Sequence, residues 1–143
     1  MSIIVKVASS TSNLESVFAI RKKVFVEEQN VSEAEEYDAF ETASTHLIAF
    51  VNGEAVGTCR YRNTDKGIKL ERFAVLQEKR KDGIGAALVK ETLAQVDLSQ
   101  HIYLHAQIQV VDFYKNFGFE KVGSEFEEAG IKHYKMVLRN LST

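Results

Sequence analysis

The spacing of apolar residues along this chain alternates between a period of two and a period near that of a helix, and each change marks a predicted element. Short alternating or continuous apolar runs indicate β-strands, and apolar residues three or four apart indicate helices. We predict strands at 3–7, 46–51, 54–61, 68–75, 102–106, 119–126 and 133–138, and helices at about 12–27, 84–96 and 110–117. This order, β-α-β-β-β-α-β-α-β-β, predicts a mixed α+β fold in one domain, residues 1–143.

Turn signals support these boundaries. The pair Asn52-Gly53 is typical of a type I′ hairpin turn, because both residue types tolerate positive φ angles. Ser12 and Glu15 have the spacing of a capping box at the start of the first helix. Gly118 suits the C-terminal end of the last helix.

The segment 70–96 combines a strand, a charged turn that contains Gly83 and Gly85, and an amphipathic helix. Glycines at a helix start leave backbone N–H groups exposed at the positive end of the helix dipole, a geometry that binds phosphates. The GxxxxGK[ST] loop of NTPases is absent. A dinucleotide-binding fingerprint would place its first glycine directly after the strand, whereas residues 76–82 intervene here.

Composition narrows the class of protein. The chain has 143 residues, 45% of them hydrophobic, which is enough to bury a core. Its formal net charge of −2 gives no electrostatic argument for binding nucleic acid or an anionic membrane. Cys59 is the only cysteine, so an internal disulfide is impossible and a reducing compartment, the cytoplasm, is expected. We expect no secretion signal, membrane span or metal site.

Two separated motifs resemble the GNAT superfamily of N-acetyltransferases. The run Arg80–Ala86, RKDGIGA, resembles the family's Q/R-x-x-G-x-G/A turn, and the run Gln107–Phe119, QIQVVDFYKNFGF, resembles a second family segment. Residues 21–31 and 129–136 further resemble the ElaA-like branch of small bacterial acetyltransferases. The resemblance covers nearly the whole chain. It implies the GNAT fold, which is a central, mostly antiparallel, twisted sheet of about seven strands flanked by helices. The hydrophobic pattern of this chain predicts the same number of strands.

The resemblance also implies how acetyl-CoA, the cofactor of the family, would bind. The glycine turn would hold the pyrophosphate, and the preceding strand would splay from its neighbour and offer backbone groups to the pantetheine arm. The residues so implied are Phe73, Ala74, Val75, Arg80, Lys81, Asp82, Gly83, Ile84, Gly85, Ala86, Gln107 and Tyr114. Asp82 stands where relatives often have a small or basic residue, so its carboxylate must point away from the phosphates.

Acetyl transfer to an amine needs a base and benefits from an acid, because the amine loses a proton and the departing thiolate gains one. The resemblance places Tyr114 as the acid. His133 and Glu71 are the candidate bases. Histidine ordinarily titrates at about 6.5, and Gly130 to Met136 resembles a Gly-x-x-His-x-x-Met tail whose histidine is a base in related acetyltransferases. The further candidates are Glu41, His46 and His105.

The acceptor site is predicted from two arginines. Arg21 in the first helix and Arg72 in the central strand suit bidentate recognition of a carboxylate or phosphate, and Gln107 and His133 complete the predicted site. The acidic, interrupted segment 27–41 predicts a loop with one helical turn that faces a cleft or solvent. As alternatives, its carboxylates form salt bridges with these arginines, or they attract a polyamine or a protein lysine.

We therefore predict an acyltransferase that moves an acetyl group from acetyl-CoA directly to the primary amine of a small molecule, with preference for one that carries a carboxylate or phosphate. The competing class is a non-catalytic module that binds or senses coenzyme A. Nucleic acid and membrane are not expected partners. The expected state is a monomer or a homodimer, in which an exposed edge strand pairs two subunits.

Overall fold

The computed structural model describes residues 2–139, which form a seven-stranded sheet in the order β1-β2-β3-β4-β5-β7-β6. The strands are β1 (Ile3–Val7), β2 (Thr45–Val51), β3 (Glu54–Thr64), β4 (Gly67–Val75), β5 (Ile102–Gln107), β6 (Phe119–Glu128) and β7 (Ile131–Leu138). All paired neighbours among these strands run antiparallel except β4 and β5, which are parallel. The predicted order of elements along the chain and the mixed, mostly antiparallel sheet are confirmed, whereas the order of the strands within the sheet comes from the structure alone.

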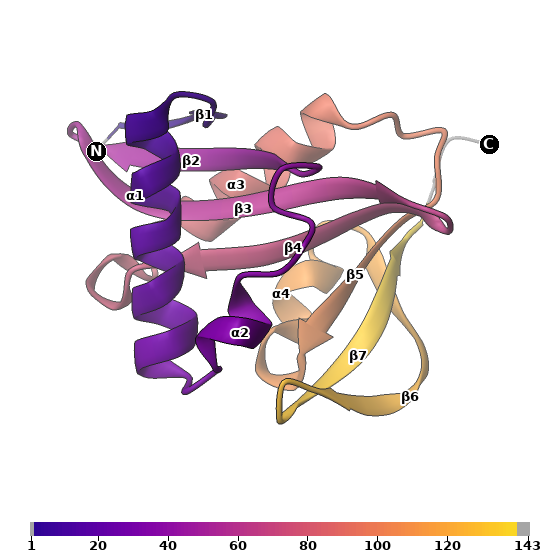
Figure 1. Cartoon of the computed structure of the whole chain (residues 1–143). Helices are drawn as coiled ribbons and strands as arrows, with labels where there is room; N and C mark the ends of the chain where they lie inside the picture. Colours follow the sequence, from indigo (N-terminus) through magenta and orange to yellow (C-terminus); the bar gives the residue numbers. More distant parts are fainter. Residues whose placement is uncertain (1, 140–143) are drawn as a thin grey trace.

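Helices cover both faces of the sheet. They are α1 (Thr11–Arg21), α2 (Glu33–Glu36), α3 (Ile84–Gln95) and α4 (Val111–Lys115), with a π-helical segment η1 (Lys22–Glu28) and the 3₁₀ turns η2 (Gln77–Lys79) and η3 (Ile108–Val110). In Figure 1, α1 and α2 lie in front of the sheet, whereas α3 and α4 lie behind it. The single helical turn predicted within the acidic segment is α2.

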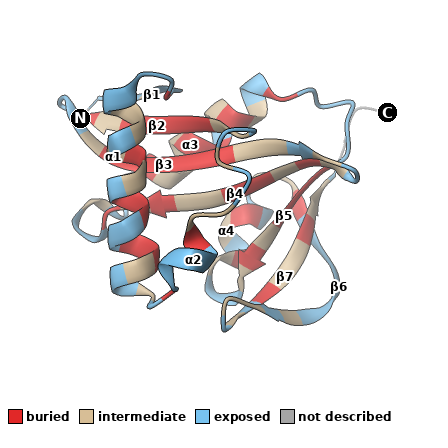
Figure 2. Cartoon of the chain, viewed as in Figure 1, coloured by how far each residue is buried: buried red, intermediate tan, exposed pale blue. Residues whose placement is uncertain are grey.

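Each face of the sheet has its own core, and buried positions concentrate along the central strands and on the inner sides of the helices (Figure 2). Behind the sheet, Leu88 and Val89 of α3 pack against fully buried residues of β2 to β5. In front of it, Val17 of α1 packs against Ile48. Strand β2 is buried on both faces, which explains its nearly continuous apolar run.

The first helix departs from the prediction at both ends. Its N-cap is Ser10 rather than Ser12, because the Ser10 hydroxyl accepts a hydrogen bond from the Asn13 backbone N–H at 3.1 Å. The expected capping box with Glu15 is therefore wrong. At its other end the helix continues as η1, whose wider turn ends when the Gln29 N–H donates to the Val24 carbonyl.

Positive φ angles mark two of the three hairpin turns of the sheet and the end of the last helical segment. Asn52 and Gly53 have φ angles of 52° and 80°, so the predicted type I′ turn between β2 and β3 is confirmed. Gly118, with φ of 94°, ends the last helical segment as expected. Ala129 and Gly130, with φ of 51° and 75°, form the turn between β6 and β7.

Strands β4 and β5 pair over only three residues and then part. Their register runs from Ile68 opposite Ile102 to Leu70 opposite Leu104, although β4 continues to Val75 and β5 to Gln107. Beyond that point β4 also carries a bulge, with Arg72 at a φ of 59°. A bulge bends its strand and redirects side chains. The splay that the family resemblance implied is therefore present, and Figure 1 shows β5, β7 and β6 diverging from β4.

Gly67 fixes the start of this parallel pair, and its replacement tests that role. A Cβ atom at Gly67, whose φ is 138°, would lie 2.1 Å from the His101 carbonyl oxygen, which accepts the Ile68 N–H at 2.8 Å. We expect Gly67→Ala to lower the free energy of unfolding by more than about 2 kcal/mol. Gly123→Ala is the control, because Gly123 also has a positive φ but has nothing within 4 Å of the added atom. Equal losses in urea denaturation of the two variants would contradict this role.

Candidate active site

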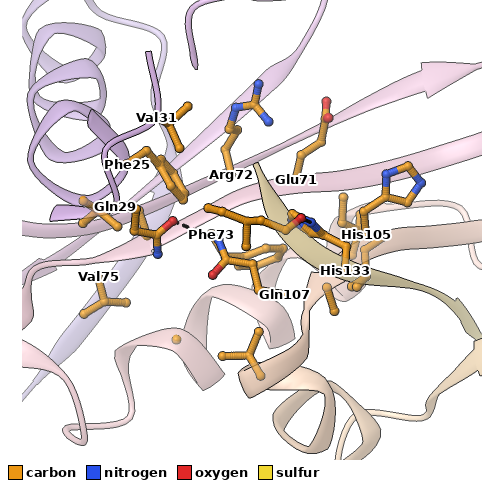
Figure 3. A pocket seen from close by; sticks show the side chains of 18 of the residues that line it. Phe25, Gln29, Val31, Glu71, Arg72, Phe73, Val75, His105, Gln107 and His133 are labelled. Atoms are coloured by element: carbon orange, nitrogen blue, oxygen red, sulfur yellow. Dashed lines mark hydrogen bonds between the residues drawn. The ribbon is translucent and has the colours of Figure 1, made fainter. Parts of the chain in front are cut away.

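The opening between β4 and β5 leads into a cavity of about 990 Å³, a volume within the range of pockets that enclose small ligands. Its walls come from η1, α2, β4, β5, the start of α3, α4 and the β6–β7 hairpin. Figure 3 shows Arg72 and Glu71 of β4 on one side of this space and His105 and His133 on the other. The cavity thus joins segments that are distant in the sequence.

One end of the cavity is the glycine turn. Gly83, with φ of 85°, precedes α3, and the first N–H bonded within the helix is that of Ala87, to the Gly83 carbonyl at 3.0 Å. The preceding N–H groups of the turn therefore lack helical partners and are available to an anion. Lys81 and Gly85 line the cavity, whereas Ala86 and the exposed Asp82 do not. Asp82 therefore lies outside the cavity, in agreement with the expectation that its carboxylate points away from a bound phosphate.

Arg80 ties this turn to two other elements. Its Nε donates to the Val75 carbonyl at 3.0 Å, and its Nη atoms donate to the two carboxylate oxygens of Glu28 at 2.6 and 2.8 Å. The hydrogen bond from Arg80 lowers the pKa of the Glu28 carboxyl. Because Glu28 already binds both Nη atoms of Arg80, a phosphate that contacts this guanidinium must either share it with the Glu28 carboxylate or displace that carboxylate. Arg80 therefore has a structural contact that the sequence did not indicate.

The open edge of β4 carries the backbone groups predicted to bind pantetheine. The Leu76 N–H donates to Val56 of β3, and backbone groups alternate in direction along a strand. Val75 therefore turns its backbone toward the opening, whereas Ala74, opposite Thr58, turns toward β3. Phe73, Ala74 and Val75 all line the cavity.

Tyr114 stands on α4 at the inner end of the opening. Its ring packs edge-on against Phe73, with 5.7 Å between ring centroids, and against Phe113 and Phe119. The residue is 7% exposed and lines the cavity. Burial raises the pKa of its phenol above the ordinary value, so the hydroxyl is protonated at neutral pH.

His133 is held in one tautomer by the backbone. Its Nδ1 lies 2.7 Å from the Ile131 carbonyl oxygen, and a carbonyl can only accept, so Nδ1 carries the proton. In the neutral ring Nε2 therefore has the free lone pair. His133 is 7% exposed and lines the cavity, and its ring stacks on Phe126 at 5.8 Å.

Glu71 is surrounded by cations. Its carboxylate accepts from Arg60 at 3.1 Å and from Arg62 at 2.6 Å, and Lys69 Nζ lies 3.3 Å away. Burial opposes its ionisation, but the charge of Arg60 and the hydrogen bond from Arg62 outweigh that effect and lower its pKa. A carboxylate stabilised in this way is a weak base.

Arg21 does not reach the cavity. It is 1% exposed, and its guanidinium binds Glu36 at 2.6 Å and both carboxylate oxygens of Glu41 at 2.8 and 2.9 Å. The predicted role of Arg21 in acceptor binding is therefore wrong, because Arg21 does not line the cavity. The alternative, in which Arg21 forms salt bridges with the acidic segment, is what the structure has. The same contacts occupy Glu41, which is also absent from the lining. Burying Arg21 without such partners would be costly.

Arg72 does line the cavity. Its Nη2 lies 3.3 Å from the Asp38 carboxylate, and its Nε lies 3.2 Å from Glu36 without forming a hydrogen bond. Arg72 is partly exposed, so its guanidinium can face a ligand. Arg21 and Arg72 thus converge through Glu36 rather than on an acceptor.

Sequence reasoning missed several residues of this site. Arg60, fully buried, binds Asp38 at 2.7 Å and Glu41 at 2.9 Å, and so holds the acidic segment against the sheet. Gln29 accepts a hydrogen bond from Gln107 at 2.9 Å across the cavity, as the dashed line in Figure 3 shows. Glu128 and His105 pair at 3.1 Å on the far wall. The two residues of each of these pairs are at least 19 positions apart in the sequence, so no local spacing indicates that they are in contact.

A family model described as an acetyltransferase (GNAT) domain matches residues 8–140. The chain belongs to the GNAT acetyltransferase family. It is 37% identical over 134 residues to an uncharacterized N-acetyltransferase, YjcF, of Bacillus subtilis, with 92% of this chain and 96% of the relative covered. It is 30% identical over 134 residues to protein ElaA of Escherichia coli, with 89% and 88% covered.

The known structures agree with this assignment to GNAT acetyltransferases. The crystal structure of Escherichia coli ElaA matches with a TM-score of 0.86 at 27% identity, over 96% of this chain and 100% of that one. A GNAT acetyltransferase from Elizabethkingia anophelis, with acetyl-CoA bound, shares the fold at a TM-score of 0.68 and 14% identity, over 94% of each chain. The predicted family, its ElaA-like relatives and the GNAT fold are confirmed, and the chain is a GNAT-type N-acetyltransferase. Within residues 2–139, no helix has the length and apolar character needed to cross a membrane.

The ion pairs around Arg60 give this GNAT acetyltransferase a testable pH dependence. Burial opposes ionisation of Asp38, but hydrogen bonds from Arg60 and the Phe40 backbone lower its pKa to about 2. A lowered folded-state pKa stabilises the protein above the unfolded value of about 3.9 and ceases to do so as pH falls toward the folded value. We expect Asp38→Asn to lower the free energy of unfolding by about 1–3 kcal/mol at pH 7.

This difference between wild type and Asp38→Asn should shrink as pH falls from about 4 toward 2. Urea denaturation at a series of pH values measures it. Asp65→Asn, in an exposed turn, is the control and should match wild type throughout. A difference that stays constant down to pH 3 would rule out the charge of Asp38 as its source.

Proposed function

We propose that the chain transfers an acetyl group from acetyl-CoA directly to the primary amine of a small molecule that carries a carboxylate or phosphate. The observation that carries this proposal is the splayed cavity itself. It runs from a glycine turn with unpartnered N–H groups to a chamber where His133 and Tyr114 both reach its surface. A cofactor site and two groups suited to proton transfer therefore share one space.

The turn fits the phosphates of coenzyme A. A side chain at Gly83 would require a strained positive φ, and a Cβ at Gly85 would lie 3.4 Å from the Phe113 ring. Without these side chains, a phosphate can approach the backbone N–H groups of the turn. Lys81 adds positive charge. The acetyl-CoA bound to the Elizabethkingia anophelis enzyme of the same fold supports this site. When bound, acetyl-CoA supplies an activated acetyl thioester.

His133 is the proposed base. Its fixed tautomer leaves Nε2 free to take a proton from the acceptor's ammonium group, after which the neutral nitrogen can form the C–N bond. Glu71 is the less suitable of the two predicted bases, because three cations stabilise its carboxylate. We assign Glu71 to positioning Arg62 and Lys69 on the cavity wall.

Tyr114 is the proposed acid. As the C–S bond breaks, its protonated phenol donates to the departing thiolate, and the phenolate regains a proton from solvent. Packing against Phe73, whose strand would bear the thioester, holds the ring beside the opening. The raised pKa keeps the phenol protonated before the reaction begins.

The charges of the acceptor chamber support an acidic acceptor over a polyamine. Arg62, Lys69 and Arg72 line the same wall. The carboxylates of that wall are already neutralised by arginine, so they offer little attraction to a polycation. The acidic group of the acceptor would bind at Arg72, with Gln107 near the reacting end of the chamber.

Thiol release from acetyl-CoA tests the function. The panel comprises glycine, β-alanine, 2-aminoethylphosphonate, spermidine and a lysine peptide. We expect thiol release with an amine that carries a carboxylate or phosphonate, and little thiol release with spermidine. Tight binding of acetyl-CoA without thiol release for any amine would favour the non-catalytic module, and a failure to bind coenzyme A would overturn the assignment.

Tyr114→Phe tests the acid. The variant should lower kcat by about 100-fold while the dissociation constant of coenzyme A changes by less than about 2-fold, because only the proton donor is lost. Steady-state kinetics and calorimetry measure the two quantities. Tyr103→Phe, which removes a phenol hydroxyl outside the cavity lining, is the matched control. Unchanged kcat in Tyr114→Phe would exclude the acid role.

His133→Gln tests the base. We expect kcat to fall by about 100-fold at pH 7, and the gap from wild type to narrow as pH rises, because more of the amine is then already deprotonated. Exposed His101→Gln serves as the control. A gap that stays the same from pH 7 to 9.5 would show that His133 does not remove the proton.

A further inference from the structure

The carboxylates that line the cavity are not equivalent. Four of them have an arginine partner: Glu28 with Arg80, Glu36 with Arg21 and Arg72, Asp38 with Arg60 and Arg72, and Glu71 with Arg60 and Arg62. Glu35 is exposed at the rim and binds Ser32. Glu128 differs from the four paired carboxylates, because within residues 2–139 neither arginine nor lysine lies within ion-pair distance of its carboxylate. It differs from Glu35 because it is only partly exposed and a histidine holds it. Its partner is His105, whose Nδ1 lies 3.1 Å from Oε1.

The β6–β7 hairpin places Glu128 beside the proposed base. Phe126 pairs with His133 in register, and Glu128 pairs with Ile131. Because side chains two residues apart project from the same face of a strand, Phe126 and Glu128 share a face with His133. The tight turn at residues 129–130 returns the chain directly after Glu128. Glu128 and His133 both line the cavity.

Aromatic packing fixes this arrangement. The Phe126 ring lies between the two histidines, edge-on to His105 at 5.0 Å and stacked on His133 at 5.8 Å. His105 comes from β5, the strand that forms one side of the splay. The pair Glu128–His105 therefore joins the hairpin to the edge of the opening. Its position depends on packing between three strands.

One oxygen of Glu128 remains free for a ligand. Oε1 is occupied by His105, and Oε2 has no hydrogen-bond partner among the described residues. The side chain is 43% exposed. The hydrogen bond from His105 lowers the pKa of Glu128 to about 2, with burial opposing it and the charges of His105, Lys69 and His133 assisting. The carboxylate is therefore anionic at neutral pH and too weak a base to take the amine's proton.

We propose that Glu128 Oε2 binds the ammonium group of the acceptor and presents it to His133. This inference rests on the proposed function and deepens it. The ammonium first binds Glu128 by a charge-assisted hydrogen bond. One of its other protons passes to His133 Nε2, and the lone pair so released forms the C–N bond. The C–S bond then breaks, Tyr114 protonates the departing thiolate, and the nitrogen releases one further proton to solvent to give the amide. Glu128 thus binds and orients the substrate, while His105 fixes the carboxylate.

This position for the ammonium defines the acceptor further. Its acidic group binds the wall that carries Arg62, Lys69 and Arg72, and its amine points toward the β6–β7 hairpin. The acceptor class is therefore a short zwitterion, with a primary ammonium and a carboxylate or phosphate at separate ends. An alcohol with the same skeleton would keep the contacts of the acidic end and lose the contact with Glu128.

Glu128→Gln tests the inference because the amide keeps the shape and loses the charge. The substrates are the amine of the panel with the highest kcat/KM and its alcohol counterpart, for example β-alanine and 3-hydroxypropionate, or 2-aminoethylphosphonate and 2-hydroxyethylphosphonate. We expect the KM of the amine to rise by about 10-fold or more, the loss expected for a hydrogen bond to a charged group. The KM of acetyl-CoA and the inhibition constant of the alcohol should each change by less than about 3-fold.

Glu127→Gln is the matched control, since Glu127 neighbours Glu128 but is exposed and does not line the cavity. It should have the kinetics of wild type. Equal KM for the amine in Glu128→Gln and Glu127→Gln would overturn the inference. Parallel weakening of the amine and the alcohol would also overturn it, because a structural defect affects both. Absence of thiol release in wild type is a different result, which refutes the proposed function.

Discussion

The parting of β4 and β5 is the constraint on which the rest of this molecule depends. Backbone N–H and C=O groups inside a protein need partners, yet the ladder between these two strands ends after Leu70 and Leu104. The bulge at Arg72 turns β4 away, and Arg80 occupies the Val75 carbonyl that the lost ladder leaves open. Among residues 2–139, neither a strand nor a helix fills the resulting gap. It becomes the cavity, with backbone groups of β4 available to a ligand.

A network of buried charges holds the walls of that gap. Arg21 and Arg60 are almost completely buried, so each needs anionic partners. Three of those partners, Glu36, Asp38 and Glu41, come from the acidic segment between η1 and β2, and Glu71 of β4 also pairs with Arg60. Ion pairs place this segment beside the cavity, together with the packing of Val31 in the core and of Tyr37 against Phe18. The arginines and the acidic segment are therefore one structural unit. The cations that line the cavity are Arg62, Lys69 and Arg72, together with Lys79, Arg80 and Lys81 near the glycine turn.

Most of the fold was predictable from local patterns. Periodicity and turn chemistry account for the order of helices and strands along the chain and for the hairpin at Asn52-Gly53. They also account for the glycine turn and the single turn of α2. The errors have local and long-range causes. The N-cap was misplaced by two residues because Ser10 and Ser12 both suit a cap, and only the bond to Asn13 distinguishes them. Arg60 and Glu128 were missed because their partners lie many residues away, where no sequence spacing connects them.

The sequence by itself determined the elements, the glycine turn before α3 and the resemblance to GNAT enzymes, because helix and strand periodicity, turn glycines and short motifs act over a few neighbouring residues. Only the tertiary structure decided which charged side chains face the cavity. Arg21 and Arg72 have the same chemistry in the sequence, but one is enclosed by Glu36 and Glu41 and the other lines the site. The reason is physical: the availability of a charge depends on burial and on partners brought from distant strands, and neither exists until the sheet has formed.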